Sequence, residues 1–88
     1  MGYDVRLSEN AIKSLKRIDY YQGQIIIAWI EKNLQDCDNP RLYGKPLVGD
    51  KRGYWCYRVG SYRIMADIRD SVIMINIVNV GHRREVYE

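Results

Sequence analysis

The sequence has no phenylalanine and only one histidine, two prolines and two cysteines among its 88 residues. Two cysteines are too few for a disulfide scaffold, and Cys37 and Cys56 do not have the spacing of metal ligands, so we expect reduced thiols. No apolar run approaches the ~20 residues of a membrane-spanning helix, and the early charges of Asp4 and Arg6 exclude the apolar core of a signal peptide. These absences predict a cytoplasmic protein with no membrane partner.

What the sequence does contain is typical of one small globular domain, which we expect to span residues 1–88. Hydrophobic residues make up 47% of the chain and charged residues 28%, unlike a disordered protein. Residues 1–40 hold five Lys/Arg and six Asp/Glu, a net charge of −1, whereas residues 41–88 hold nine and five, a net charge of +4. The C-terminal half therefore favours an anionic partner, although a solvated basic face is common.

The N-terminal half reads as one strand followed by two helices. Alternating apolar residues predict a short strand over residues 3–7, and Ser8 stands where a helix N-cap belongs. Apolar residues at helical spacing predict a first helix through Ile18 and a second from Gln22 to about Gln35, with Gly23 at the corner between them. Pro40 ends this helical region.

Residues 39–53 show no periodicity and hold both prolines, three glycines and four basic residues. So long a connection is often functional in a small domain. The alternative is a loop that wraps the edge of the core through Leu42, Leu47 and Val48.

In residues 54–87, apolar and polar residues alternate at the period of a half-buried strand, and this pattern predicts a β-meander. Gly60-Ser61 is the signature of a two-residue type II′ hairpin turn, which places Val59 opposite Tyr62, and so on down the strands. One face of the hairpin then carries Trp55, Tyr57, Val59, Tyr62, Ile64 and Ala66 under the helices, and the other carries Tyr54, Cys56, Arg58, Arg63, Met65 and Asp67.

Asp70-Ser71 predicts the second turn, after which Ile73, Ile75 and Ile77 join the face that holds Ile64. The expected fold is α+β, with a short N-terminal strand, a helical hairpin and a three-stranded antiparallel meander. The helices pack on one face of a small, mainly antiparallel sheet.

Arg58 lies directly opposite Arg63 in this register. Like charges across two strands are destabilising by about 0.2–1 kcal/mol, so the pair needs compensation. Asp67 supplies it in one interpretation, and a bound phosphate supplies it in the other, since guanidinium groups bind phosphate oxygens in paired geometry. His82 and Arg83 end the last strand beside this hairpin, where a substrate could be held.

The segments GKPLVGDKRGYWCYRVGSYRIMADI and VNVGHRREVY resemble the RelE branch of the RelE/ParE toxin superfamily. This resemblance covers nearly the whole chain and implies a toxin of a type II toxin–antitoxin pair. Such a toxin enters the ribosomal A site, cuts mRNA there without a cofactor or metal ion, and is inhibited by a RelB-like antitoxin.

Carried over by position, the resemblance places the hairpin arginine of the family on Arg63, its strand-end arginine on Arg83 and its C-terminal tyrosine on Tyr87, and Arg58 matches the arginine before the turn. Tyr54 and Cys56 occupy positions where lysines stand in a well-studied relative, and many relatives carry arginine at the position of Cys56. This difference leaves the general base open.

Metal-free RNA cleavage needs a deprotonated 2′-hydroxyl, a stabilised phosphorane and a protonated 5′-oxygen. Arginine suits only the second task, because it stays charged. We therefore expect Arg63 and Arg83 to hold the scissile phosphate and Tyr87 or His82 to transfer protons. Further substrate contacts are assigned to Arg58, Lys45, Lys51, Arg52 and Arg84.

Two other functions remain open at this point. The first is a ParE-like inhibitor of DNA gyrase, against which the ending GHRREVY argues. The second is an RNA- or ribosome-binding module without catalysis, in which the same arginines bind phosphate but no residue supplies the base.

Overall fold

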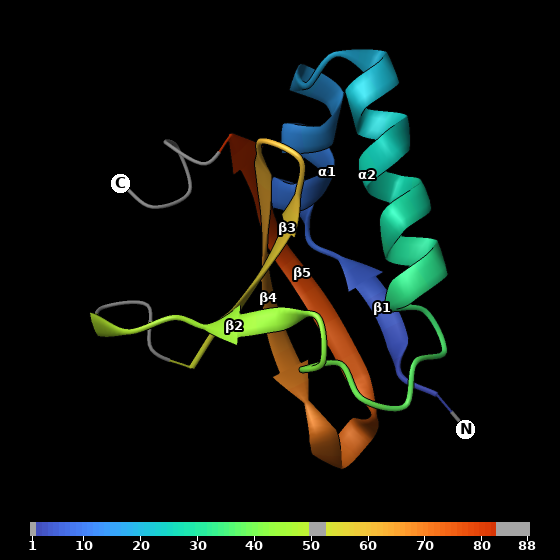
Figure 1. The fold of residues 1–88 in the computed structure, drawn as a ribbon, viewed down its shortest axis with the longest axis vertical. Coiled ribbons are helices and arrows are strands. Elements are labelled where there is room, and N and C mark those ends of the chain that lie inside the picture. The colour runs from blue at the N-terminus through green and yellow to red at the C-terminus, as the bar shows by residue number, and fades with distance from the viewer. Residues whose placement is uncertain (1, 50–52, 83–88) are drawn as a thin grey trace.

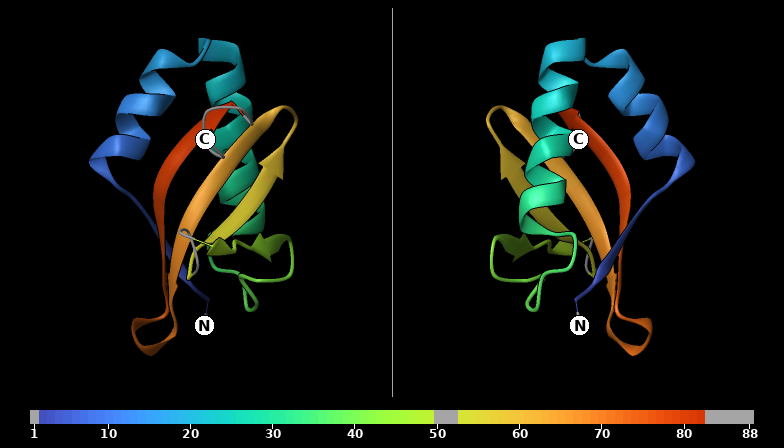
Figure 2. Two further views of the ribbon diagram at one scale, coloured as in Figure 1. Left: turned by 90° about the vertical axis from the view of Figure 1, so that its left-hand side faces the viewer. Right: turned by 90° about the vertical axis from the view of Figure 1, so that its right-hand side faces the viewer.

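The computed structural model describes residues 2–49 and 53–82 and confirms the α+β fold class. The elements follow the order β1 (Asp4–Leu7), α1 (Glu9–Arg17), α2 (Tyr20–Asn33), β2 (Gly44–Pro46), β3 (Trp55–Val59), β4 (Tyr62–Arg69), the 3₁₀ turn η2 (Asp70–Val72) and β5 (Met74–His82). The strands form one five-stranded sheet in the order β1-β5-β4-β3-β2, in which β1 runs parallel to β5 and the other pairs are antiparallel. Both helices cover the same face, which Figures 1 and 2 show.

Helix α1 begins as predicted at Ser8, whose side chain accepts a hydrogen bond from the backbone N–H of Ala11. The Ser8 hydroxyl also donates to the backbone carbonyl of Val78, which ties the start of the helix to β5. Glu9 lies in the first turn and Arg17 in the last, each at the end where its charge suits the helix dipole.

Helix α2 begins earlier than predicted, because Asp19 caps it by accepting from the backbone N–H of Gln22 at 3.3 Å. The prediction that Gly23 forms the corner between the helices was wrong. Gly23 is buried inside α2, where its missing side chain brings the helix close to the backbone of Leu15 in α1.

The predicted hairpin register between β3 and β4 is confirmed at all five pairs, from Val59 opposite Tyr62 to Trp55 opposite Ala66. Gly60 has φ +61°, whereas Ser61 is not among the residues with positive φ. This combination fits a type II′ turn, in which only the first central residue is left-handed.

The connection from β4 to β5 differs from the predicted two-residue turn. Residues 70–72 form a 3₁₀ turn, and Ile73 follows with φ 52° and 41% of its surface exposed, so its assignment to the core was wrong. Further along, a β-bulge shifts the register. Met65 pairs with Asn79 while Ala66 pairs with Ile77, which leaves Val78 as the extra residue.

The core forms between the helices and the face of the sheet that they cover. Fully buried side chains there include Ile26 of α2, Leu34 at the C-cap of α2, and Ile64, Ile75 and Ile77 from the sheet. Trp55 was expected in this core but is only half-buried, because it lies at the β2 end of the sheet, with the guanidinium of Arg41 5.5 Å from its ring centre.

Residues 44–46 form an edge strand that the sequence did not predict, pairing antiparallel with β3. The alternative of a loop packed on the core edge through Leu42, Leu47 and Val48 is wrong for two of the three residues. Leu42 and Val48 are 66% and 84% exposed, whereas Leu47 is half-buried. Pro40 is buried instead, and its carbonyl accepts a hydrogen bond from the Tyr57 hydroxyl. Among residues 2–49 and 53–82, no helix is both long and apolar enough to span a bilayer.

Candidate functional site

The side of the sheet that faces away from the helices carries a cationic face, which we define as Lys45, Arg58 and Arg63. Arg58 pairs with Arg63 across β3 and β4, and Lys45 pairs with Cys56 across β2 and β3. Directly opposed residues share a face, and so do Cys56 and Arg58, which are two positions apart on one strand. Three strands therefore direct these cationic residues to the same side.

The two opposed arginines differ in exposure. Arg58 is exposed, whereas Arg63 is buried with only 5% of its surface accessible, beside the buried Cys56 and Met65. Packing restricts the rotamers of a buried side chain, so the guanidinium of Arg63 is held in place before any ligand arrives. Asp67, which was considered as a compensating anion for the pair, accepts from Nε of Arg69 at 2.6 Å.

His82 does not lie with the two arginines. It pairs directly with Tyr62, whose side chain is on the helix side of the sheet, and the two rings meet edge to face at a centroid distance of 5.8 Å. The β-bulge between Met65 and Ala66 explains the difference, because one extra residue on β5 reverses the face of every later side chain. Gly81 takes the position opposite Arg63.

Five of the predicted site residues lie outside the described part of the chain. These residues are Lys51, Arg52, Arg83, Arg84 and Tyr87. Their assignments therefore stay predictions.

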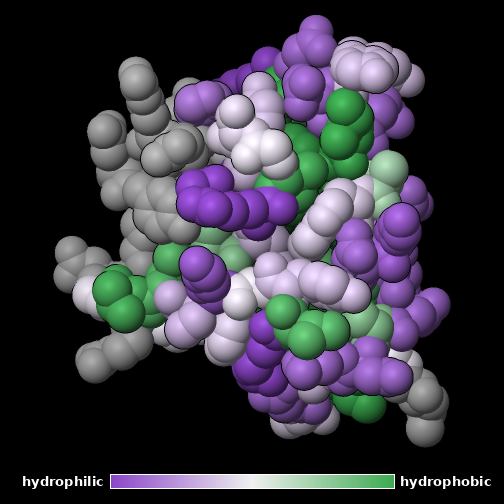
Figure 3. All heavy atoms as spheres, viewed as in Figure 1, coloured by the Kyte–Doolittle hydropathy of each residue, from purple (hydrophilic) through white to green (hydrophobic). Residues whose placement is uncertain are grey.

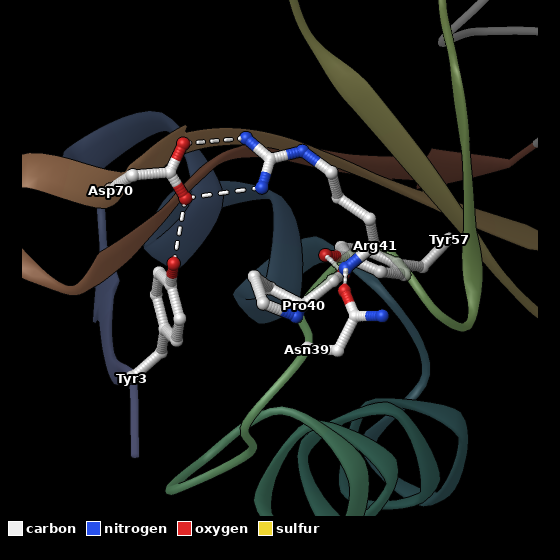
Figure 4. A network of polar contacts seen from close by, with 6 residues as sticks. All are labelled: Tyr3, Asn39, Pro40, Arg41, Tyr57 and Asp70. Carbon is white, nitrogen blue, oxygen red and sulfur yellow. Dashed lines mark hydrogen bonds and ion pairs between the residues drawn. The ribbon is translucent and has the colours of Figure 1, made fainter. Parts of the chain in front are cut away.

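Sequence reasoning missed a polar cluster that joins three distant segments, the Asp70 clasp, which we define as Tyr3, Arg41 and Asp70 (Figure 4). Both terminal nitrogens of Arg41 donate to the Asp70 carboxylate, at 3.0 and 2.8 Å, and the Tyr3 hydroxyl donates to the same carboxylate at 2.6 Å. Asn39 holds the backbone next to the clasp, since its side-chain oxygen accepts a hydrogen bond from the backbone N–H of Arg41. The paired geometry is the strong form of an arginine–carboxylate contact.

These contacts change the acid–base properties of all three clasp residues. Hydrogen bonds from Arg41 and then Tyr3 lower the pKa of Asp70 to about 2. The bond to Asp70 raises the pKa of Tyr3, and the same carboxylate raises the pKa of Arg41. At neutral pH the Asp70 carboxylate and the Arg41 guanidinium are thus charged while Tyr3 keeps its proton, and the clasp anchors the segment that leads into β2.

Tyr57 holds the other side of that segment. Its ring is fully buried, burial raises the pKa of its hydroxyl, and Gly44 of β2 lies against the ring. A Cβ atom on Gly44 would come within 2.9 Å of the Tyr57 ring, so only glycine allows this approach without a shift. Tyr57 and the clasp together fix the strand that carries Lys45.

Comparisons with known proteins identify the family of this chain. Residues 5–87 match the family model described as the ParE toxin of the type II toxin–antitoxin system parDE. Toxin RelG of Mycobacterium tuberculosis is 31% identical over 88 residues, which cover 99% of this chain and 98% of the relative.

Solved structures agree with the sequence comparisons. The toxin–antitoxin complex RelBE2 of Mycobacterium tuberculosis contains a chain that is 26% identical with a TM-score of 0.85, covering 94% of this chain and 93% of that chain. A mutant of Escherichia coli toxin RelE in the free state shares the fold, with 21% identity and a TM-score of 0.76 over 99% of this chain and 92% of that chain. The chain therefore belongs to the RelE/ParE family of toxins of type II toxin–antitoxin systems.

Proposed function

We propose that this toxin is an endoribonuclease that enters the ribosomal A site and cuts mRNA through attack of the 2′-hydroxyl, without a metal ion, and thereby stops translation. A RelB-like antitoxin holds it inactive. One observation carries this proposal, the pairing of Arg58 with Arg63 on a face that also holds Lys45.

The cationic face suits the phosphate backbone of RNA. Arg58 and Arg63, directly opposed on neighbouring strands, offer two guanidinium groups to one anion. Guanidinium groups bind phosphate oxygens in paired geometry and stay charged at every physiological pH. An exposed Arg58 can meet the incoming strand, while the buried Arg63 offers a fixed group to the scissile phosphate.

The roles of the residues follow from this arrangement. Arg63 and Arg83 hold the scissile phosphate and stabilise the negative charge of the phosphorane, and Arg58 assists. Since His82 faces the helix side, we assign proton transfer to Tyr87. An ordinary tyrosine titrates near ~10, so Tyr87 acts as a base only if neighbouring cations lower its pKa substantially.

The antitoxin proposal rests on two findings. The solved relatives include a RelBE2 complex and an archaeal RelE–RelB complex from Pyrococcus horikoshii. In this chain, two apolar hollows of about 480 and 200 Å³ share Leu7 and Ile27, and Leu7 and Ile12 are 39% and 40% exposed. Figure 3 shows hydrophobic side chains at the surface among hydrophilic ones. Such surface suits a partner chain.

A second candidate is inhibition of DNA gyrase, which the family description ParE toxin favours. In that case the toxin would bind a protein, and the cationic face would have no catalytic role.

Primer extension on message from induced cells separates the two functions. Cuts inside translated codons support the nuclease. Intact message together with loss of DNA supercoiling supports the gyrase inhibitor and contradicts the nuclease.

A further inference from the structure

A polar hollow of about 460 Å³ lies at one end of the sheet, on the side that the helices cover. Its walls come from the end of α1, the residues between the two helices, and the ends of β4 and β5. We call this hollow the end pocket and define it by the polar and aromatic side chains Ser14, Arg17, Asp19, Tyr62 and His82. None of these residues belongs to the cationic face. The volume is in the range of pockets that hold small ligands.

Two aromatic side chains form one wall of the end pocket. Tyr62 and His82 are paired across β4 and β5, their rings stand at 78° to each other, and both are half-buried. Rings fixed in this way offer a stacking surface at little entropic cost, and every nucleobase has a face that can stack on them.

The opposite wall is charged and hydrogen-bonding. Arg17 is exposed at the end of α1, and Asp19 caps α2 with one carboxylate oxygen. A carboxylate can accept several hydrogen bonds, including those from base N–H groups, and an arginine binds phosphate. Ser14 donates to the side chain of Asn79, which fixes α1 against β5 at the rim.

We propose that the end pocket binds one nucleotide of the RNA that lies beyond the stretch held on the cationic face, an inference that rests on the proposed nuclease function. An aromatic wall, a cation and a carboxylate together match the base and the phosphate of a nucleotide. An apolar peptide helix would instead need an apolar groove, and the described groove of that kind lies elsewhere, along Leu7 and Ile27.

The end of β5 connects the end pocket to the cationic face. Gly81 lies opposite Arg63, and the next residue, His82, forms part of the pocket wall. Successive residues of a strand point to opposite faces about 3.3 Å apart along the chain. An RNA strand that passes over this end of the sheet therefore meets Arg63 on one side and His82 on the other.

The test measures binding of two RNAs that cannot be cleaved because every 2′-hydroxyl is methylated. A trinucleotide reaches only the cationic face, and an octanucleotide reaches both sites. Fluorescence anisotropy gives the Kd of the parental toxin and of the variants Arg17→Gln, His82→Ala and Lys32→Gln. Lys32 is exposed near the far end of α2 and loses the same charge as Arg17, so it is the matched control.

We expect the parental toxin to bind the octanucleotide more tightly than the trinucleotide. Arg17→Gln and His82→Ala should each weaken octanucleotide binding about tenfold and leave trinucleotide binding unchanged. Arg17→Gln should also reduce the slope of log Kd against log salt by about 0.7. Because Arg17 is exposed, its replacement leaves folding intact even if His82→Ala does not.

Three results would contradict the proposal that the end pocket binds a nucleotide. If Arg17→Gln and Lys32→Gln have the same Kd for the octanucleotide while the parental toxin still binds the trinucleotide, the proposed nucleotide site is contradicted and the nuclease proposal stands. If the parental toxin binds neither RNA, the proposed nucleotide site is contradicted, and the nuclease proposal, which places cleavage on the ribosome, is decided separately by primer extension on message from induced cells. If Arg17→Gln weakens the binding of both RNAs equally, the change reflects the general charge of the protein, and this result would also exclude a nucleotide site in the end pocket.

Discussion

Arg58 and Arg63 face each other across β3 and β4, yet Arg58 is exposed and Arg63 is 5% accessible. The two opposed positions thus offer one exposed and one buried cation to a single anion. If they bind the phosphate backbone of RNA, the buried member holds the reacting phosphate and the exposed member contributes mainly to affinity.

Replacing these arginines should therefore have unequal effects. We expect Arg63→Ala to reduce message cleavage in a translating extract by about 10²–10³-fold, the range found when one preorganised donor to a transition state is removed. Arg63→Lys should rescue little, because lysine lacks the paired geometry. Arg58→Ala should mainly weaken RNA binding and reduce its salt dependence by about 0.7 in slope. Cleavage at the parental rate by Arg63→Ala would contradict the assignment.

Tyr87→Phe tests the proton transfer separately. If Tyr87 carries it, the variant should bind uncleavable RNA as tightly as the parental toxin but cut message at least about 10²-fold more slowly. The measurement pairs anisotropy with primer extension, and Tyr20→Phe is the matched control, since Tyr20 is 79% exposed and lies outside the cationic face and the end pocket. Equal cleavage by Tyr87→Phe and the parental toxin would assign the base elsewhere.

The Asp70 clasp should make stability depend on pH in the acid range. The pKa of Asp70 is about 2 in the folded protein and 3.8 in its ordinary state, so the clasp stabilises fully above pH 3.8 and loses that contribution as pH falls toward 2. We expect urea unfolding to show a stability difference between the parental toxin and Asp70→Asn that shrinks over this window. Tyr3→Phe should move the loss to higher pH, because it removes one bond that lowers the pKa of Asp70. A difference that is constant from pH 2 to pH 6 would contradict the role of the carboxylate.

Two glycines should respond to alanine in opposite directions. Gly44→Ala places a Cβ atom 2.9 Å from the Tyr57 ring and should destabilise the protein by about 1–3 kcal/mol. Gly23→Ala places a Cβ atom 3.6 Å from the Leu15 carbonyl, an ordinary contact, and should stabilise helix α2 by about 0.5–1 kcal/mol. Denaturant unfolding of both variants measures the two effects. A loss of stability in Gly23→Ala would show that the helices cannot accept the added methyl group.

The Tyr57 hydroxyl should be worth more than that of an exposed tyrosine. Tyr57→Phe leaves the buried carbonyl of Pro40 without its hydrogen bond, which should cost about 1–3 kcal/mol of unfolding free energy. Tyr20→Phe is the matched control, since Tyr20 is 79% exposed and its loss of a hydroxyl should change little. Equal stability of the two variants would show that water replaces the hydrogen bond to Pro40.

The sequence by itself determined the elements whose signals are local. A glycine in a two-residue turn settles the register of β3 and β4, and with it the opposition of Arg58 and Arg63. The cap of α1 at Ser8 is equally local, because the bond it makes lies within one helical turn.

Only the tertiary structure decided the features that depend on distant segments. The bulge in β5 has no local signature, and it moves His82 from the expected face to the opposite one. Strand β2 pairs with residues 9 to 13 positions away, such as Lys45 with Cys56. The Asp70 clasp joins residues that lie 29 positions apart, Arg41 and Asp70, and 67 positions apart, Tyr3 and Asp70. The alternation of apolar and polar residues along the chain indicates where strands form. The face of the sheet on which each side chain lies is set by packing between segments that meet only in the folded protein.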